Sequence, residues 1–229
     1  MSIKTEQKEW TPEEVVPERI LKLLKPDGSG KNYNYANAFY QIVSLLKEQK
    51  RTGWINFDIP NPESIADHMY RMSIIAMSLS PASFGDHKPD ISKCVKIALV
   101  HDIAESLVGD ITPTDANIDK VEKNKREYKT ILYLSDVIRP YNEDFSKELV
   151  DLWLDYEEQR CFEAVITKDI DKYELLIQTL EYEKACKGEK NLNEFFSCRK
   201  AIKTKEIKDL ADVIMNDREK FWESVKKQN

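Results

Sequence analysis

Long apolar runs, paired cysteine motifs and low-complexity segments are all absent from this sequence of 229 residues. No window approaches the roughly 18 consecutive apolar residues that a membrane-spanning helix needs. The polar and charged residues 1–10 carry no secretory signal. The four cysteines show no C-x-x-C spacing, which argues against a zinc knot or a disulfide framework and indicates reduced thiols. We therefore expect a cytoplasmic protein, or one shared with the nucleus, that has no membrane segment.

An excess of positive charge is also absent. The chain has 35 lysines and arginines against 41 aspartates and glutamates, which gives a net charge of −6. Nucleic-acid polymers and anionic membranes attract basic surfaces, so neither is expected as a partner. An acidic enzyme can still bind a phosphate group locally, through a metal ion and a few cations.

Strand signals are missing too, because no stretch alternates branched or aromatic residues with polar ones. Apolar residues instead recur every three or four positions, which predicts an all-α fold. Asp90 is expected to cap one helix and Gly53 to end another. The predicted helices cover residues 12–24, 33–50, 63–79, 90–107, 118–138, 145–158, 161–187, 191–202 and 205–226, and a loop is predicted over 109–113.

Histidine is scarce: there are three, and two of them lie in predicted helices. His68 is in the segment 63–72, and the adjacent pair His101 and Asp102 follows the apolar residues 98–100. Ionisable groups buried in an apolar helix are costly unless something neutralises and coordinates them. A divalent cation is one explanation, and a satisfied core histidine beside a capping aspartate is the other. Imidazole and carboxylate ligands together suit a hard or borderline divalent ion with open positions for water and substrate.

A further acid would complete such a ligand set. Asp171 is the best candidate and Asp169 is its competitor, but residues two apart in a helix are about 200° apart and cannot both face one ion. Glu105 stands four residues after His101, which places the two on one face of the predicted helix. Capping or salt-bridging is the alternative role for Glu105.

His68, the His101–Asp102 pair and Asp171 resemble the H…HD…D metal signature of the HD-domain phosphohydrolases. More narrowly, the chain resembles the 5′-deoxynucleotidase branch, with its HD-domain-containing-protein-2-like members in eukaryotes. The resemblance spans residues 35–187 and is carried by segments 46–54, 62–72, 98–110 and 168–174. It implies a helical HD-domain fold, a homodimer, and hydrolysis of deoxyribonucleoside 5′-monophosphates to deoxyribonucleosides and phosphate.

The same resemblance implies roles for the matching residues. The ligands of a divalent metal (Mn, Co, Mg, Fe, Zn or Cu) are His68, His101, Asp102 and Asp171. Glu105 is the general acid/base, and Asp110 contacts the sugar or a second ion. As an alternative, Glu105 and Asp110 could hold a second, weaker Mg²⁺ together with the Ile111 carbonyl.

Arg51 and Trp54 match the basic and aromatic substrate-binding positions of the family, although two residues separate them here. A phosphomonoester carries about two negative charges near neutral pH, and its hydrolysis needs charge stabilisation and an activated water, which a metal supplies. The planar guanidinium group of Arg51 could bind the phosphate through two N–H groups. Lys168, about one helical turn before Asp171, could add a point charge. The alternative for both cations is a solvated surface position.

The resemblance also predicts how the chain is organised. Residues 1–30 are expected to form an N-terminal extension, with a tail at 1–11. Residues 31–190 are expected to form the HD domain, and residues 191–229 C-terminal helices that pack on it. Two other functions are alternatives to a 5′-deoxynucleotidase. One is another HD-type nucleotide phosphodiesterase or pyrophosphohydrolase, which the short chain disfavours. The other is a catalytically silent interaction protein that keeps the fold, against which the intact ligand set and Glu105 argue.

Overall fold

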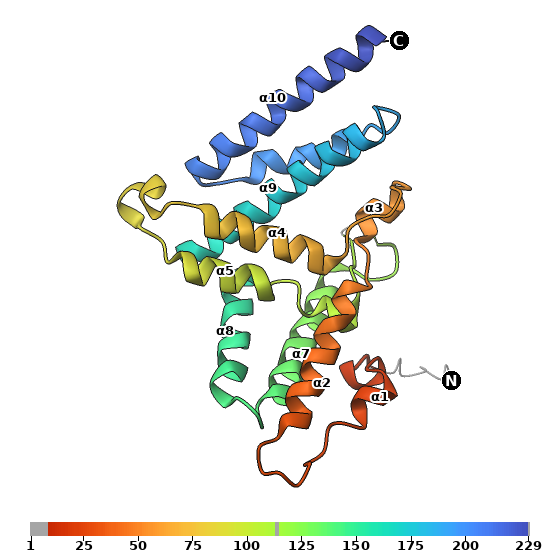
Figure 1. Cartoon of the computed structure of the whole chain (residues 1–229), viewed down its shortest axis with the longest axis vertical. Coiled ribbons are helices and arrows are strands. Elements are labelled where there is room, and N and C mark those ends of the chain that lie inside the picture. The colour runs from red at the N-terminus through yellow and green to blue at the C-terminus, as the bar shows by residue number, and fades with distance from the viewer. Residues whose placement is uncertain (1–8, 113–114, 229) are drawn as a thin grey trace, which may run out of the picture. The chain divides into compact units, whose positions relative to one another are not determined.

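The computed structural model describes residues 9–112 and 115–228. Positions 1–8 of the expected tail and Pro113 of the expected loop lie outside these ranges. Within them the regular structure is helical, and the one backbone pairing of β type is an isolated antiparallel bridge between Lys50 and Ser64 (Figure 1). The predicted all-α fold is confirmed. No helix of the described chain is long and apolar enough to cross a membrane.

The chain forms two compact units, each built from separate segments. Unit 1 comprises residues up to 58, 62–65 and 102–151. Unit 2 comprises 59–61, 66–101 and the residues from 152 onward.

Unit 1 has a core between two long helices that contact each other, α2 and α7. Buried side chains such as Ile42, Ile131 and Leu134 recur at helical spacing and are fully inaccessible to solvent. Asp119 caps α7 by accepting from the backbone N–H of Glu122 at 2.8 Å. The elements are η1 (Pro12–Glu14), α1 (Glu18–Leu21), α2 (Tyr33–Val43), η2 (Ser44–Lys47), α3 (Thr52–Asn56), α6 (Glu105–Val108), α7 (Lys120–Ile138) and the first part of α8 (Glu143–Glu158).

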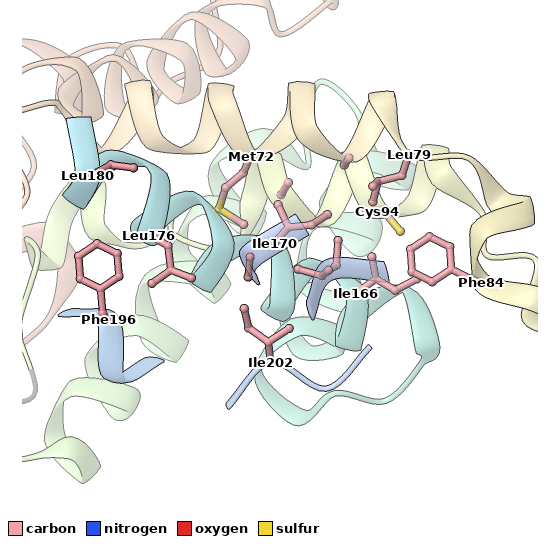
Figure 2. Close-up of a cluster of buried hydrophobic side chains, with 14 residues drawn as sticks. Met72, Leu79, Phe84, Cys94, Ile166, Ile170, Leu176, Leu180, Phe196 and Ile202 are labelled. Atoms are coloured by element: carbon pink, nitrogen blue, oxygen red, sulfur yellow. The ribbon is translucent and has the colours of Figure 1, made fainter. Parts of the chain in front are cut away.

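Unit 2 is organised around the 24-residue helix α9, which contacts α5, η4 and α10. Figure 2 shows the core, in which Met72, Cys94 and Ile170 are fully buried. Asp90 caps α5 through the backbone N–H of Lys93, as predicted. The elements are α4 (Ile65–Ser78), η3 (Pro81–His87), α5 (Ile91–Val100), the rest of α8, α9 (Phe162–Ala185), η4 (Asn193–Ala201) and α10 (Lys205–Gln228).

Several predicted helix boundaries are wrong. The helix expected over 12–24 is reduced to η1 and α1, because Pro17 lies between them and cannot continue a helix. Gly53 does not stop a helix but lies inside α3, whose central side chain, Trp54, is 1% exposed. Residues 193–201 form a 3-10 helix, not an α-helix.

The single helix predicted over 90–107 is also wrong. It ends at Val100, and α6 begins only at Glu105. Between them the backbone N–H groups of Glu105 and Ser106 donate three residues back, to Asp102 and Ile103. This tighter winding changes the rotation per residue. The argument that placed His101 and Glu105 on one helix face therefore does not apply.

Candidate metal centre

His68 projects from α4 into unit 2 and is completely buried. Its Nε2 atom lies 3.3 Å from Oδ1 of Asp171, which α9 contributes. The other carboxylate oxygen of Asp171 accepts a hydrogen bond from the Tyr156 hydroxyl at 2.8 Å. Two ligands that each lie about 2.1 Å from one ion are about 3.0–3.4 Å apart in octahedral or tetrahedral geometry. The separation of His68 and Asp171 therefore fits a shared divalent ion.

His101 follows directly after α5 and is 3% exposed. Its Nδ1 lies 3.0 Å from the Ala98 carbonyl oxygen, which can only accept, so Nδ1 carries the proton and Nε2 carries the lone pair. The His101 ring is 5.5 Å from that of His68 and 4.8 Å from that of Tyr156. The two histidines belong to a group of side chains that could hold an ion, and the group includes Asp102, the next residue in the chain.

Asp169 and Asp171 have different environments, although only one residue separates them. Asp169 is 1% exposed and accepts hydrogen bonds from the backbone N–H groups of Lys203 and Thr204 and from the Thr204 hydroxyl. These bonds hold the segment that leads into α10. Asp169 is thus occupied in connecting two helices, whereas Asp171 lies beside His68.

Sequence reasoning missed three residues around His68. The Nδ1 atom of His68 lies 2.6 Å from Oε2 of Glu174, which is fully buried on α9. Arg71 donates to the other oxygen of Glu174 from Nε at 2.8 Å and from Nη2 at 2.5 Å, and also to Gln178. Two spacings in the sequence could have signalled this set: Arg71 is three residues after His68, and Glu174 is three after Asp171.

Glu105 lies in unit 1 and is 5% exposed. Burial raises its pKa well above the ordinary value, and the negative charges of Asp102 and Asp110 raise it further. Lys123, whose Nζ is 3.7 Å away, and Arg51 oppose the shift without cancelling it. A carboxyl group that keeps its proton above the usual pH range is suited to general acid/base work.

Lys123 and Thr52, which sequence reasoning also missed, fix the loop that carries Asp110. The Asp110 carboxylate accepts from the backbone N–H of Thr52 at 2.6 Å, and its carbonyl accepts from the Thr52 hydroxyl at 2.7 Å. Lys123 donates to the Ile111 carbonyl at 2.9 Å. Because Thr52 comes directly after Arg51, these bonds connect the Arg51–Trp54 segment to Asp110.

The predicted substrate-binding side chains have protein partners. The Arg51 guanidinium lies 3.9 Å from the carboxylate of Glu63, to which the Trp54 indole N–H donates at 2.9 Å. Trp54 is buried. In unit 2, the Lys168 ammonium lies 4.3 Å above the Tyr156 ring and 3.9 Å from Glu157. The substrate roles of Arg51, Trp54 and Lys168 stay predictions.

Comparison with known proteins identifies the family. The model of the HD domain matches residues 43–211, which is most of the chain. The chain belongs to the HD-domain family. Within this family it is 46% identical to the 5′-deoxynucleotidase YGK1 of Saccharomyces cerevisiae, over 95% of this chain and 97% of the relative. It is 40% identical to the 5′-deoxynucleotidase hdd1 of Schizosaccharomyces pombe, over 83% and 93%.

Solved structures agree with this assignment. The structure of HD domain-containing protein YGK1 superposes with a TM-score of 0.72 at 40% identity, covering 93% of this chain and all of that one. PH0347 from Pyrococcus horikoshii superposes with a TM-score of 0.62 at 28% identity, covering 80% of this chain and 98% of that one. The resemblance seen in the sequence is therefore confirmed for the HD-domain fold.

Proposed function

We propose that this protein is a metal-dependent 5′-deoxynucleotidase, which hydrolyses deoxyribonucleoside 5′-monophosphates to deoxyribonucleosides and phosphate. The observation that carries the proposal is the contact of the buried His68 with the partly exposed Asp171, 3.3 Å apart, in a chain that aligns over 95% of its length with a relative named 5′-deoxynucleotidase. A histidine and a carboxylate at this separation suit a divalent ion that keeps positions open for substrate.

In this proposal, the metal is held by His68, His101, Asp102 and Asp171. A bound divalent cation polarises a phosphoryl oxygen and lowers the pKa of water that it binds. The Tyr156 hydroxyl holds one oxygen of Asp171, so the other oxygen faces His68. Glu105 is the proposed general acid/base, because its raised pKa favours the protonated form, which can donate a proton.

Four side chains are the proposed contacts of the substrate. The guanidinium group of Arg51 binds the phosphate through two N–H groups, and the ammonium group of Lys168 adds a positive charge beside it. Trp54 and Asp110 are the proposed contacts of the sugar. Thr52 supports this assignment, because its two hydrogen bonds to Asp110 hold the Arg51–Trp54 segment and the Asp110 loop together within unit 1.

We also propose that the protein binds one metal ion and forms a homodimer. Lys123 supplies positive charge to both Glu105 and the Ile111 carbonyl, so we favour one metal ion over an additional Mg²⁺ at Glu105, Asp110 and Ile111. A homodimer is supported by exposed apolar side chains on α4. They are spaced by four and three residues along one face: Tyr70, Ile74 and Met77.

A reconstitution assay tests the proposed activity. Protein stripped with a chelator is assayed for phosphate release from dAMP, AMP and a cyclic nucleotide, with Mn²⁺, Co²⁺ or Mg²⁺. We expect metal-dependent release that is faster from dAMP than from AMP. His101→Ala should abolish release, whereas His87→Ala, at an exposed histidine, should keep it. The absence of release from any monophosphate would contradict the proposal, and turnover of the cyclic nucleotide alone would favour a phosphodiesterase.

A further inference from the structure

Two glutamates of α9 are completely buried and bound by an arginine, but in different ways. Arg218 spans the carboxylate of Glu183, donating from Nε to Oε2 and from Nη2 to Oε1. Arg71 instead donates from both Nε and Nη2 to Oε1 of Glu174, and its Nη2 also donates to Gln178. The second oxygen of Glu174 then lies 2.6 Å from Nδ1 of His68. The arginine therefore orients Glu174 so that one oxygen faces the histidine.

This arrangement determines where His68 carries a proton. An arginine guanidinium stays charged, and a carboxylate that accepts two of its N–H groups is held ionised, as an acceptor only. The short contact with Glu174 therefore requires that Nδ1 of His68 donates. The opposite nitrogen, Nε2, is the one that faces Oδ1 of Asp171 at 3.3 Å.

We propose that Arg71 and Glu174 are positioning residues that fix the ring and the Nδ1 proton of His68, so that Nε2 is presented to the metal. The inference rests on the proposed function for the presence of the metal. Carboxylates behind metal-binding histidines orient the ring and raise its basicity, and their loss weakens metal binding about 10–100-fold. The pair spans α4 and α9, so it also sets the distance of His68 from Asp171.

Structural support alone does not explain this pair. An ion pair that contains a fully buried carboxylate is weak support for stability, because desolvation of that carboxylate offsets much of the attraction between the charges. Glu183 shows what a purely structural pair does in this fold: its carboxylate also accepts from Trp222 and from the backbone of Leu192, which connects α9 to η4 and α10. No histidine is among these partners. Glu183 is therefore the matched control for Glu174.

Metal affinity is the first test. Glu174→Gln and Glu183→Gln each neutralise a buried carboxylate of α9 that an arginine binds, so both are expected to destabilise the fold. We expect Mn²⁺, titrated into stripped protein and followed by the electron paramagnetic resonance of the free ion, to bind Glu174→Gln about 10–100-fold more weakly than wild type. Glu183→Gln should bind as wild type does. Equal affinities of Glu174→Gln and wild type would overturn the inference.

Histidine NMR on the metal-free protein is the second test. Only three histidines contribute to a spectrum of ¹⁵N-histidine-labelled protein, and His68→Gln assigns one signal by its loss. A proton on Nδ1 of His68 is expected, in a strong hydrogen bond that Glu174→Gln weakens and Glu183→Gln leaves unchanged. A wild-type His68 without a proton on Nδ1 would overturn the inference whatever the affinities are.

A second variant covers the case in which Glu174→Gln does not fold. Arg71 is one-third exposed, so Arg71→Gln is a milder change that should weaken Mn²⁺ binding in the same direction. Unchanged affinity of that variant would overturn the inference. The proposed activity fails separately: wild type that binds Mn²⁺ but releases no phosphate contradicts the nucleotidase and leaves the role of Glu174 intact. Wild type that binds no metal contradicts both.

Discussion

At the scale of single residues, the acids of α9 show that surroundings, and not residue type, decide what a carboxylate does. Asp169 accepts from the backbone before α10, and Asp171 lies against His68 and Tyr156. Glu174 bridges His68 and Arg71, and Glu183 holds α10. All of these are charged groups on one helix, yet only Asp171 and Glu174 contact a histidine that is a candidate ligand. The proposed metal site therefore depends on the contacts that Asp171 and Glu174 make with His68, while other acids of the same helix stabilise the fold.

The raised pKa of Glu105 predicts that this residue destabilises the folded protein increasingly as pH rises. In the folded protein Glu105 keeps a proton that the unfolded chain loses above its ordinary pKa of 4.5. Stability of the metal-free wild type should therefore fall as pH rises from 4.5 toward the folded pKa. Glu105→Gln has no proton to lose, so its Tm advantage over wild type should grow across that range and then level off. Thermal unfolding in a chelator over a pH series measures this difference.

The control for Glu105 is an exposed glutamate with the opposite shift. Lys147 hydrogen-bonds to Glu143 and lowers the pKa of that carboxyl. Glu143→Gln should therefore show no rise in relative Tm as pH increases above 4.5. A Glu105→Gln advantage that does not vary with pH would contradict the raised pKa.

The candidate ligands could be named from the sequence because of two arguments, the resemblance to a known metal signature and the geometry of a single helix. Their angular separation along α9 predicted that Asp169 and Asp171 could not both face one ion, and of these two acids the structure places Asp171 beside His68. Glu174 could not be assigned in this way, because its partner Arg71 is 103 residues away in the chain. Lys123 was missed for the same reason: its contacts with Glu105 and Ile111 depend on how α7 packs in unit 1.

At the scale of elements, α9 and α10 form one paired structure. Asp169 holds the start of α10, and Glu183 binds Arg218 and Trp222 further along it. The turn after α9 brings Gly188 against α10, at a φ of +79° that L side chains rarely adopt. A Cβ at Gly188 would lie 2.9 Å from a methyl group of Val225, so the two helices meet there with no room for a side chain.

Gly188→Ala is therefore expected to destabilise the fold in two ways. The positive φ costs about 1–2 kcal/mol for a residue with a Cβ, and overpacking against Val225 adds about 1–3 kcal/mol. Gly30→Ala is the matched control, since its φ is +72° but nothing lies within 4 Å of the added Cβ. Chemical denaturation should show a clearly larger loss for Gly188→Ala, and Val225→Ala should recover part of it. Equal losses for the two glycine variants would contradict the close approach of α9 and α10.

The spacing of apolar residues predicted where helices occur in the chain, but it did not predict the residues at which they begin and end. The apolar repeat located α4, α7, α9 and α10 correctly, because each of these helices buries apolar side chains at helical spacing. It failed between His101 and Ala104, where apolar composition continues although the hydrogen bonding tightens and α5 ends. Where α5 ends depends on how the residues before and after this point pack in the fold. The spacing of apolar residues in the sequence contains no information on that packing.

At the scale of the whole molecule, the fold interleaves segments that are distant in the sequence. The division into 1–30, 31–190 and 191–229 describes contiguous stretches, whereas each compact unit combines several separate ones. No shift in composition marks those exchanges, so sequence reasoning could not find them. His101 and Asp102 are consecutive, yet the first belongs to unit 2 and the second to unit 1.

Metal binding should raise the stability of the folded protein, because a ligand that binds only the folded state shifts the equilibrium away from unfolding. An ion that binds the folded state alone adds about 2.7 kcal/mol at 100 times its Kd, which corresponds to about 5–11 °C in Tm for a chain of this size. Asp171→Ala should lose this shift because it removes a proposed ligand. Asp169→Ala should begin from a lower Tm, since it loses its bonds to Lys203 and Thr204, but should keep the full shift. Thermal unfolding with and without Mn²⁺ separates these outcomes. Equal loss of the shift in both variants would show that Asp171 has no special relation to the metal.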